Sequence, residues 1–302
     1  MLPRIHDTST TIRNAVYVIG ASDGTSSVER GELLLDGSLT VFTTVPGAAL
    51  ATDRSSHAIA RIGRYLYVVA GSAPSPLASV ERAAIKADGS LDNFAAVSAA
   101  LVQARLGASC VVIGNALYVI SGIGLDHSRL TSIERSVISS DGTLGAFEIV
   151  SGVTLNTGRN YFTTLVTDSS LYVIGGLDDA TGGTSSIERA AINADGTLST
   201  FAPVSNLLFS RGTHASVVVG NTVYVVGGLI SGELVPDTER ATINLDGTTT
   251  AFSVAAGLNL AEVRARHTAA AVANHAYLLG GVTMRSDGAT EAVLAIERAN
   301  AR

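Results

Sequence analysis

Residues 171–201 read LYVIGGLDDATGGTSSIERAAINADGTLSTF, and degraded copies of this segment recur along the whole chain of 302 residues. Each copy combines an aromatic strand pattern that ends in small residues, a Val/Ile/Thr-Glu-Arg tripeptide and, in the first five, an Asp-Gly turn followed by Phe. Repeats of about 50 residues are typical of architectures that stack one structural unit per repeat. The six tripeptide arginines lie 51 to 58 residues apart, at Arg30, Arg82, Arg135, Arg189, Arg240 and Arg298.

Turn residues within each copy predict four short strands. Residues 214–219 end at Gly220-Asn221, a hairpin signal, and a second strand covers residues 222–228. A third strand carries Glu-Arg and turns at Asp-Gly, and a fourth carries the Phe. Runs such as residues 217–219 are apolar on both strand faces, so the sheets are expected to be covered on both sides. We therefore predict an all-β, six-bladed β-propeller of four-stranded antiparallel blades.

The Gly doublet after Leu-Tyr-Val and the later Val-Glu-Arg resemble the kelch repeat over essentially the whole chain. The doublet is intact at Gly175-Gly176, Gly227-Gly228 and Gly280-Gly281 and altered elsewhere. Kelch repeats usually place Tyr after Glu-Arg and Trp in the fourth strand, whereas this chain has small residues and Phe. The resemblance is to a small-residue, bacterial-looking variant, and it implies a propeller that serves as a protein-binding scaffold.

We expect one propeller domain over residues 1–302, in which the last repeat lacks a fourth strand. The last blade is then expected to have three strands and an open edge, at which a second copy could pair to form a homodimer. Whether the missing strand is native or marks a chain boundary stays open. The approximate blade boundaries are 4–53, 54–104, 105–158, 159–210, 211–263 and 264–302.

The composition is that of short strands packed through small side chains, with 46% hydrophobic, 5% aromatic and 15% charged residues. A net charge of −6 without a basic cluster argues against a nucleic-acid partner. The single Cys110 excludes an internal disulfide framework. With no long apolar run and no signal-peptide pattern, we expect a soluble protein without a membrane partner; its compartment stays open.

A further arginine precedes each second-strand Tyr by thirteen residues, where the chain crosses into the innermost strand of a blade. We expect these leading arginines to form a ring near one mouth of the central channel. In kelch substrate adaptors, arginines of this crossing loop clasp acidic peptides, and the resemblance implies the same ligand-binding role here; guanidinium groups suit carboxylates. The leading arginines are Arg4, Arg54, Arg105, Arg159, Arg211 and Arg264.

An alternative is that each leading arginine pairs inside the protein with a tripeptide glutamate, because the two sets are equal in number. A buried charge is tolerated only when it is paired and hydrogen-bonded, so we assign the glutamates a structural role. These glutamates are Glu29, Glu81, Glu134, Glu188, Glu239 and Glu297.

The third residue after each leading arginine is His or Asp in four repeats, which raises the question of a metal site. Packed sheets lie about 10 Å apart, whereas a zinc ligand lies about 2 Å from the ion. We therefore expect no metal here, and histidines bonded to backbone near the channel. The six residues at this position are Asp7, His57, Ala108, Phe162, His214 and His267.

The loops between second and third strands vary in length and are expected on the same face as the leading arginines. Binding sites on rigid scaffolds usually lie on such loops. Residues 178–179 lack the oxygen-rich spacing of a calcium loop, so an ordinary solvated loop is expected there. Charged and polar residues that break the repeat are the candidate ligand contacts, namely His127, Arg129, Asp178, Asp179, Glu233 and Arg285.

Motifs of catalysis are missing: there is no nucleophile elbow, P-loop, HExxH or dinucleotide fingerprint. We predict a non-enzymatic binding or scaffold propeller without a cofactor, which recognises an acidic peptide, a protein or a glycan on the face with the crossing loops. One alternative is a kelch-type enzyme acting on a sugar at the channel mouth, similar to mutarotases or to galactose oxidase. The latter needs copper and a Tyr–Cys cross-link, and Cys110 lies in a core-like strand. Another alternative is a structural repeat unit of a larger surface protein.

Overall fold

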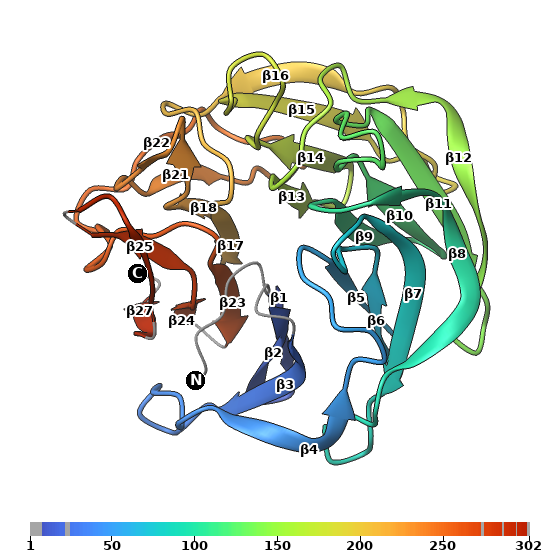
Figure 1. Cartoon of the computed structure of the whole chain (residues 1–302). Coiled ribbons are helices and arrows are strands. Elements are labelled where there is room, and N and C mark those ends of the chain that lie inside the picture. Colours follow the sequence, from blue (N-terminus) through green and yellow to red (C-terminus); the bar gives the residue numbers. More distant parts are fainter. Residues whose placement is uncertain (1–7, 22–24, 273–274, 286, 294, 301–302) are drawn as a thin grey trace.

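The computed structural model describes residues 8–21, 25–272, 275–285, 287–293 and 295–300, and Figure 1 shows their sheets arranged in a ring around a common axis. These residues form an all-β, six-bladed β-propeller of antiparallel sheets and contain no helix. Correspondingly, no helix that could cross a membrane occurs in this part of the chain. The predicted fold class is confirmed.

The first three blades each contain four strands in sequence order. Blade 1 consists of β1 (Thr8–Ile12), β2 (Ala15–Ala21), β3 (Thr25–Glu32) and β4 (Thr43–Ala49). Blade 2 consists of β5 (Ala58–Ile62), β6 (Tyr65–Val69), β7 (Leu77–Ala84) and β8 (Ala95–Arg105). Blade 3 consists of β9 (Ser109–Ile113), β10 (Ala116–Ile120), β11 (Ser132–Ile138) and β12 (Leu144–Thr154).

Blade 4 repeats the four-stranded arrangement and consists of β13 (Thr163–Val166), β14 (Ser170–Ile174), β15 (Ser186–Ala191) and β16 (Ala202–Asn206). Blades 5 and 6 add a small hairpin between their second and third main strands. Blade 5 consists of β17 (Ala215–Val219), β18 (Thr222–Val226), β21 (Glu239–Thr242) and β22 (Ser253–Val254), with the hairpin β19 (Leu229–Ile230) and β20 (Glu233–Leu234). Blade 6 consists of β23 (Thr268–Val272), β24 (His275–Leu279) and β27 (Glu297–Asn300), with the hairpin β25 (Val282–Met284) and β26 (Thr290–Ala292).

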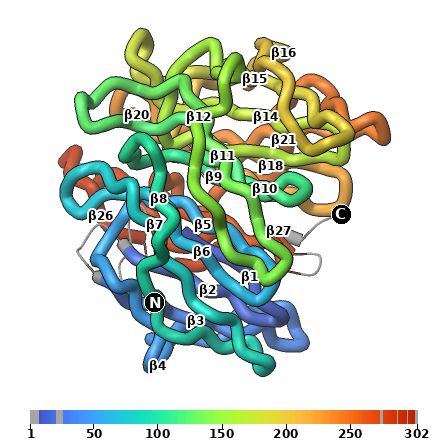
Figure 2. Tube along the Cα trace, turned by 90° about the vertical axis from the view of Figure 1, so that its right-hand side faces the viewer, coloured from blue at the N-terminus to red at the C-terminus, as the bar shows by residue number. Residues whose placement is uncertain are grey.

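The hydrophobic core is divided into layers that lie between neighbouring blades. One layer combines Tyr118 and Ile120 of β10 with Leu171 and Val173 of β14, all of them buried. This explains why the second strands are apolar on both faces, since each face packs against a different neighbour. At the rim, the long strands β8 and β12 also lie side by side, as both views show (Figures 1 and 2).

Small residues after Glu-Arg make room for the fourth-strand phenylalanine. A Cβ atom at Gly31 would lie 2.5 Å from the ring of Phe42, so a side chain there requires the ring to move. Phe42 itself is buried against blade 6. The absence of Tyr after Glu-Arg and the use of Phe in the fourth strand are therefore two parts of one packing arrangement.

Turns between the third and fourth strands fasten each blade to the one before it. In the turn of blade 4, the Asp195 carboxylate accepts hydrogen bonds from the Thr197 backbone N–H at 2.9 Å and its hydroxyl at 2.6 Å. The glycine carbonyl of such a turn then accepts a hydrogen bond from the second-strand Tyr of the preceding blade. The five pairs are Tyr17–Gly89, Tyr67–Gly142, Tyr118–Gly196, Tyr172–Gly247 and Tyr277–Gly37.

The ring closes between blade 6 and blade 1 through side chains and turns. Tyr277 donates to the Gly37 carbonyl at 2.6 Å, and the hydroxyls of Ser9 and Thr268 lie 2.7 Å apart. Blade 6 has three main strands among the described residues, as predicted. Pairing of a second copy at its edge stays a prediction.

We expect Tyr277→Phe to lower the free energy of unfolding by about 1 kcal/mol, because it leaves the buried Gly37 carbonyl without its donor. Tyr224 is the matched control: it occupies the same position in blade 5, and its hydroxyl has no hydrogen bond to the described residues. Tyr224→Phe should change the stability by less than about 0.5 kcal/mol. Urea denaturation of both variants measures the difference, and equal losses would contradict this account of ring closure.

Candidate functional site

Five leading arginines lie inside the blades and pair with the tripeptide glutamate of their own blade. Their side chains are 0–1% exposed. Arg4, like Asp7, lies outside the described residues. The ion pairs are Arg54–Glu81 at 2.6 Å, Arg105–Glu134 at 2.6 Å, Arg211–Glu239 at 2.8 Å, Arg264–Glu297 at 2.5 Å and Arg159–Glu188.

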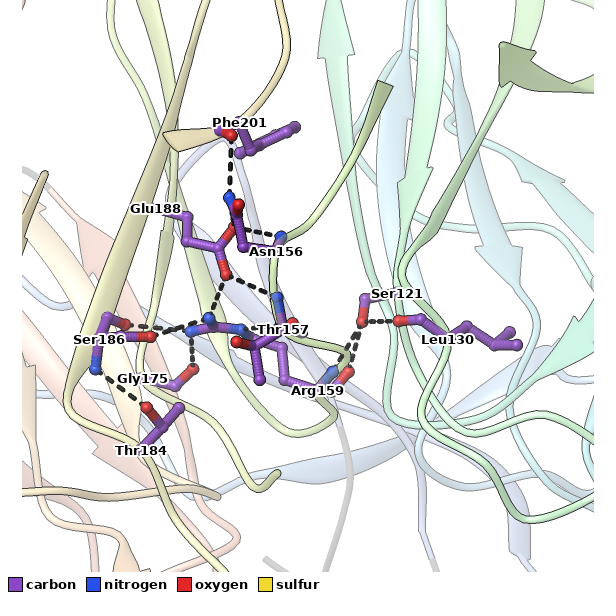
Figure 3. A network of polar contacts seen from close by, with 10 residues as sticks. All are labelled: Ser121, Leu130, Asn156, Thr157, Arg159, Gly175, Thr184, Ser186, Glu188 and Phe201. Atoms are coloured by element: carbon purple, nitrogen blue, oxygen red, sulfur yellow. Dashed lines mark hydrogen bonds and ion pairs between the residues drawn. The ribbon is translucent and has the colours of Figure 1, made fainter. Parts of the chain in front are cut away.

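Blade 4 illustrates the network that each arginine makes (Figure 3). One terminal nitrogen of Arg159 donates to the carbonyls of Gly175 at 2.8 Å and Ser186 at 3.0 Å, and the other donates to the Ser186 hydroxyl and to Glu188. Glu188 also accepts from the backbone N–H of Asn156 at 2.7 Å. The pair thus joins the crossing loop to the second and third strands of the blade.

This placement agrees with the alternative hypothesis, in which each leading arginine pairs with a tripeptide glutamate inside the protein. The guanidinium groups were expected to surround the channel mouth, but they point into the sheets, where the acid and the backbone carbonyls satisfy them. They have no exposed surface with which to contact a ligand, so the candidate site is built from the residues that follow them.

Two residues after each leading arginine, the backbone adopts the left-handed conformation. The φ angles are 53° at Ser56, 62° at Gly107, 51° at Tyr161, 53° at Thr213 and 58° at Arg266. Each peptide N–H from Gly107 onward donates to the carbonyl of the corresponding residue in the preceding blade, at 2.8 to 2.9 Å. A chain of hydrogen bonds therefore runs around the channel from blade 2 to blade 6. Left-handed non-glycine residues cost energy and often occur at binding sites.

These residues surround a cavity of about 220 Å³ in the channel. Tyr161 reaches across it, and its hydroxyl lies 3.0 Å from that of Ser56 in blade 2. Gly107 in the intervening blade makes room, because a Cβ atom there would lie 3.2 Å from the tyrosine ring. Burial raises the pKa of Tyr161, while Ser56 and Arg266 oppose the shift.

Arg266 is the arginine of this cavity wall, and it is half-buried. Its Nε atom is buried without a hydrogen-bond partner, and its side chain makes no hydrogen bond or ion pair with the described part of the chain. It differs in this from the five described leading arginines, which are all paired. The cavity therefore contains a positive charge that its described walls do not neutralise.

Three histidines of the cavity wall are neutral. Burial, reinforced by the nearby leading arginine, lowers the pKa of His57, His214 and His267 to about 3. The Nε2 atom of His57 lies 2.8 Å from the hydroxyl of Thr8, and that of His214 lies 3.0 Å from the hydroxyl of Thr163. The expectation of backbone partners is corrected for His57 and His214, whose hydrogen-bond partner is a threonine of the preceding blade.

The same contact explains why the first residue of the doublet position is glycine in three blades. The ring of His214 packs against Gly175, where a Cβ atom would lie 2.8 Å from Cε1. His57 and His267 pack in the same way against Gly20 and Gly227. No cluster of three or more His, Cys, Asp or Glu side chains suited to a metal ion occurs among the described residues.

Two of the loop candidates, from neighbouring blades, are in contact. Arg129 of blade 3 forms an ion pair with Asp179 of blade 4 and donates from Nε to Asn160 at 2.9 Å. Asp178 is buried and accepts hydrogen bonds from Thr181. The remaining candidates, His127, Glu233 and Arg285, are exposed.

The crossing loops and the second-to-third-strand loops lie next to each other, because isolated bridges such as Asn160 to Leu177 join them. The loop candidates and the channel cavity are therefore on one face. Sequence reasoning missed Tyr161 and Arg266, since the five described residues at their repeat position share no chemical type. The only available signal was that Arg266 is a second arginine just after a leading one.

Comparison with solved structures identifies the same architecture, with 502 similar chains. One of them, described as "Structure of YjhT", has a TM-score of 0.71 and 12% sequence identity, and the match covers 98% of this chain and 95% of that one. At this identity the likeness shows the fold alone, and a fold shared so widely does not specify a function. No protein-family model matches the chain. The search of curated proteins gave no match. Kelch identity stays a prediction.

We expect Glu81→Gln to lower the free energy of unfolding by about 3–5 kcal/mol, because it leaves the buried Arg54 without a counter-charge. The control is Glu148→Gln, which removes a pair with Arg135 at 3.7 Å whose glutamate side chain is 70% exposed. That change should stay below about 1 kcal/mol. Chemical denaturation tests both variants, and a small loss in Glu81→Gln would show that the buried pair does not hold the blade together.

The neutral histidines predict acid sensitivity. Their pKa is about 3 in the folded state and near 6.5 when unfolded, so the unfolded state alone binds protons between these values. Their contribution is therefore complete above pH 6.5 and is lost as the pH falls, by about 1.4 kcal/mol per pH unit for each histidine. His214→Gln should make the dependence on pH shallower between pH 6 and 4. An unchanged slope in His214→Gln would refute this assignment.

Proposed function

We propose that this protein is a binding propeller that takes a carboxylate-bearing ligand at the mouth of its central channel. The observation that carries this proposal is Arg266, whose guanidinium lines the cavity without a hydrogen bond or ion pair to the described residues. The planar guanidinium binds a carboxylate through two parallel hydrogen bonds. A partly desolvated arginine gains more from such a partner than a solvated one does.

Preorganisation of the cavity supports this function. The crossing loop that carries Arg266 is fixed on one side by the ion pair of the buried Arg264 with the partly exposed Glu297 at 2.5 Å. On the other side, the Arg266 N–H donates to the Thr213 carbonyl at 2.8 Å. A ligand that binds to a rigid loop does not have to order it, so less binding energy is lost. The leading arginines thus contribute to ligand binding indirectly, by positioning the loop.

The hydroxyls of Tyr161 and Ser56, which line the same cavity, are further groups with which a ligand could form hydrogen bonds. The exposed residues His127, Glu233 and Arg285 lie on loops of the same face, where they would contact the remainder of a larger ligand. Acidic peptides and acidic glycans both carry the carboxylate that this site requires.

We expect Arg266→Asn to weaken carboxylate binding about ten- to a hundredfold, because hydrogen bonds to a charged group contribute about 1.5–3 kcal/mol. Asparagine tolerates the left-handed backbone, so the variant removes the charge without straining the loop. Arg266→Lys keeps the charge but loses the paired geometry and should have an intermediate affinity.

The matched control is Arg13→Asn, at another left-handed arginine (φ 56°) in the turn after β1 and outside the cavity. Isothermal titration calorimetry with a triglutamate peptide and with glucuronate distinguishes peptide from glycan as the source of the acid. The proposal predicts that Arg13→Asn binds like the unmodified protein. It is overturned if neither acid binds, or if Arg266→Asn binds both acids as the control does.

A further inference from the structure

The third channel histidine lacks the partner that the other two have. His57 and His214 each meet a threonine at the first position of the innermost strand in the preceding blade, Thr8 and Thr163. The residue at this position before His267 is Ala215, the first residue of β17. The hydroxyl that Thr8 and Thr163 supply in the other two cases is therefore missing at Ala215.

As a result, His267 is buried with both ring nitrogens unpaired. The residue is 6% exposed, and among the described residues neither Nδ1 nor Nε2 has a hydrogen-bond partner. The Val226 carbonyl is near enough to oppose the lowering of the pKa, but its geometry is not that of a hydrogen bond. Nδ1 is unpaired in all three histidines, so the unpaired Nε2 is what distinguishes His267.

The unpaired ring borders the proposed binding site. His267, Ala215 and Arg266 line the same cavity, and Arg266 directly precedes His267 in the chain. A buried polar group without a partner requires an explanation, such as a bound water or ligand. A threonine at position 215 would have supplied a hydroxyl to this ring, whereas the alanine found there supplies none.

The hydrogen-bonding capacity of the His267 imidazole determines which ligand group suits it. A neutral imidazole offers one hydrogen-bond donor and one acceptor. A hydroxyl group both donates and accepts, as the threonines in the other two blades do, whereas an ionised carboxylate only accepts. His267 is therefore suited to a hydroxyl, and the adjacent Arg266 to a carboxylate.

We propose that the channel site binds a hydroxylated carboxylic acid, with its carboxylate on Arg266 and one hydroxyl on His267 in place of the missing threonine hydroxyl. This inference rests on the proposed function and narrows it. Aspartate and glutamate side chains carry no hydroxyl, so the site favours a small hydroxy acid, free or as part of a glycan, over an acidic peptide.

Three compounds with six-membered carbon rings distinguish the contribution of the carboxylate from that of the hydroxyl. Cyclohexanecarboxylate carries the carboxylate alone, myo-inositol carries hydroxyls alone, and quinate carries both, with hydroxyls at several ring positions. We expect the protein to bind quinate about fivefold more tightly than cyclohexanecarboxylate, the increment of one ordinary hydrogen bond, and myo-inositol least.

Ala215→Ser returns a hydroxyl to the position next to His267 and should abolish the preference for quinate, leaving the affinity for cyclohexanecarboxylate within about twofold. The matched control is Ala58→Ser, the same change at the first residue of β5. There the corresponding residue of the next blade is Ala108, which has no imidazole. Ala58→Ser should keep the full preference.

A measurement on the unmodified protein complements the variants. Imidazole ¹⁵N chemical shifts report hydrogen bonding at each ring nitrogen, and His267→Gln assigns the signals by their loss. Quinate should shift the Nε2 signal of His267, whereas cyclohexanecarboxylate should not.

The outcomes distinguish this inference from the proposed function. If both acids bind with equal affinity through Arg266, the hydroxyl site is refuted while the carboxylate site stands. The same holds if quinate leaves the His267 signals unchanged. If neither acid binds, the proposed function fails and this inference fails with it.

Discussion

The arginine–glutamate pair described in blades 2 to 6, and buried on both sides in blades 2 to 5, is the interaction on which the rest of the structure depends. It connects the crossing loop to two strands of the sheet that the loop enters, and it places two opposite charges where neither meets water. Such a pair is costly to form and more costly to break on one side only. The backbone that follows is consequently held in the left-handed conformation around the channel, at residues such as Ser56 and Thr213.

The architecture was predictable from the sequence, because the constraints that build a blade repeat in every blade. The Tyr of the second strand, the Asp-Gly turn and the fourth-strand Phe all contact a neighbouring blade, as Tyr118 does with Gly196, so each leaves a periodic signal. The candidate site was predictable only in part. The sequence located the leading arginines but not their direction, since a long side chain can turn inward or toward the channel. Tyr161 and Arg266 occupy a repeat position defined by backbone conformation, which leaves no common residue type.

The departures from the repeat are where this protein differs from a generic propeller. At the channel mouth, Arg266 adds a charge that the described residues do not neutralise, and Ala215 removes a hydroxyl from a buried histidine. Each departure leaves a polar group without its partner, and the two residues line one cavity. A scaffold of fixed blades with unsatisfied groups at its axis is suited to bind a ligand whose polar groups complement them.

The most direct measurement is a crystal structure of the protein grown with quinate. The account predicts density for one molecule in the channel, with its carboxylate on the Arg266 guanidinium and a hydroxyl within hydrogen-bonding distance of His267 Nε2. The buried arginine–glutamate pairs should be unchanged in the same structure. A cavity that holds only water, or quinate bound solely to the outer loops, would contradict it.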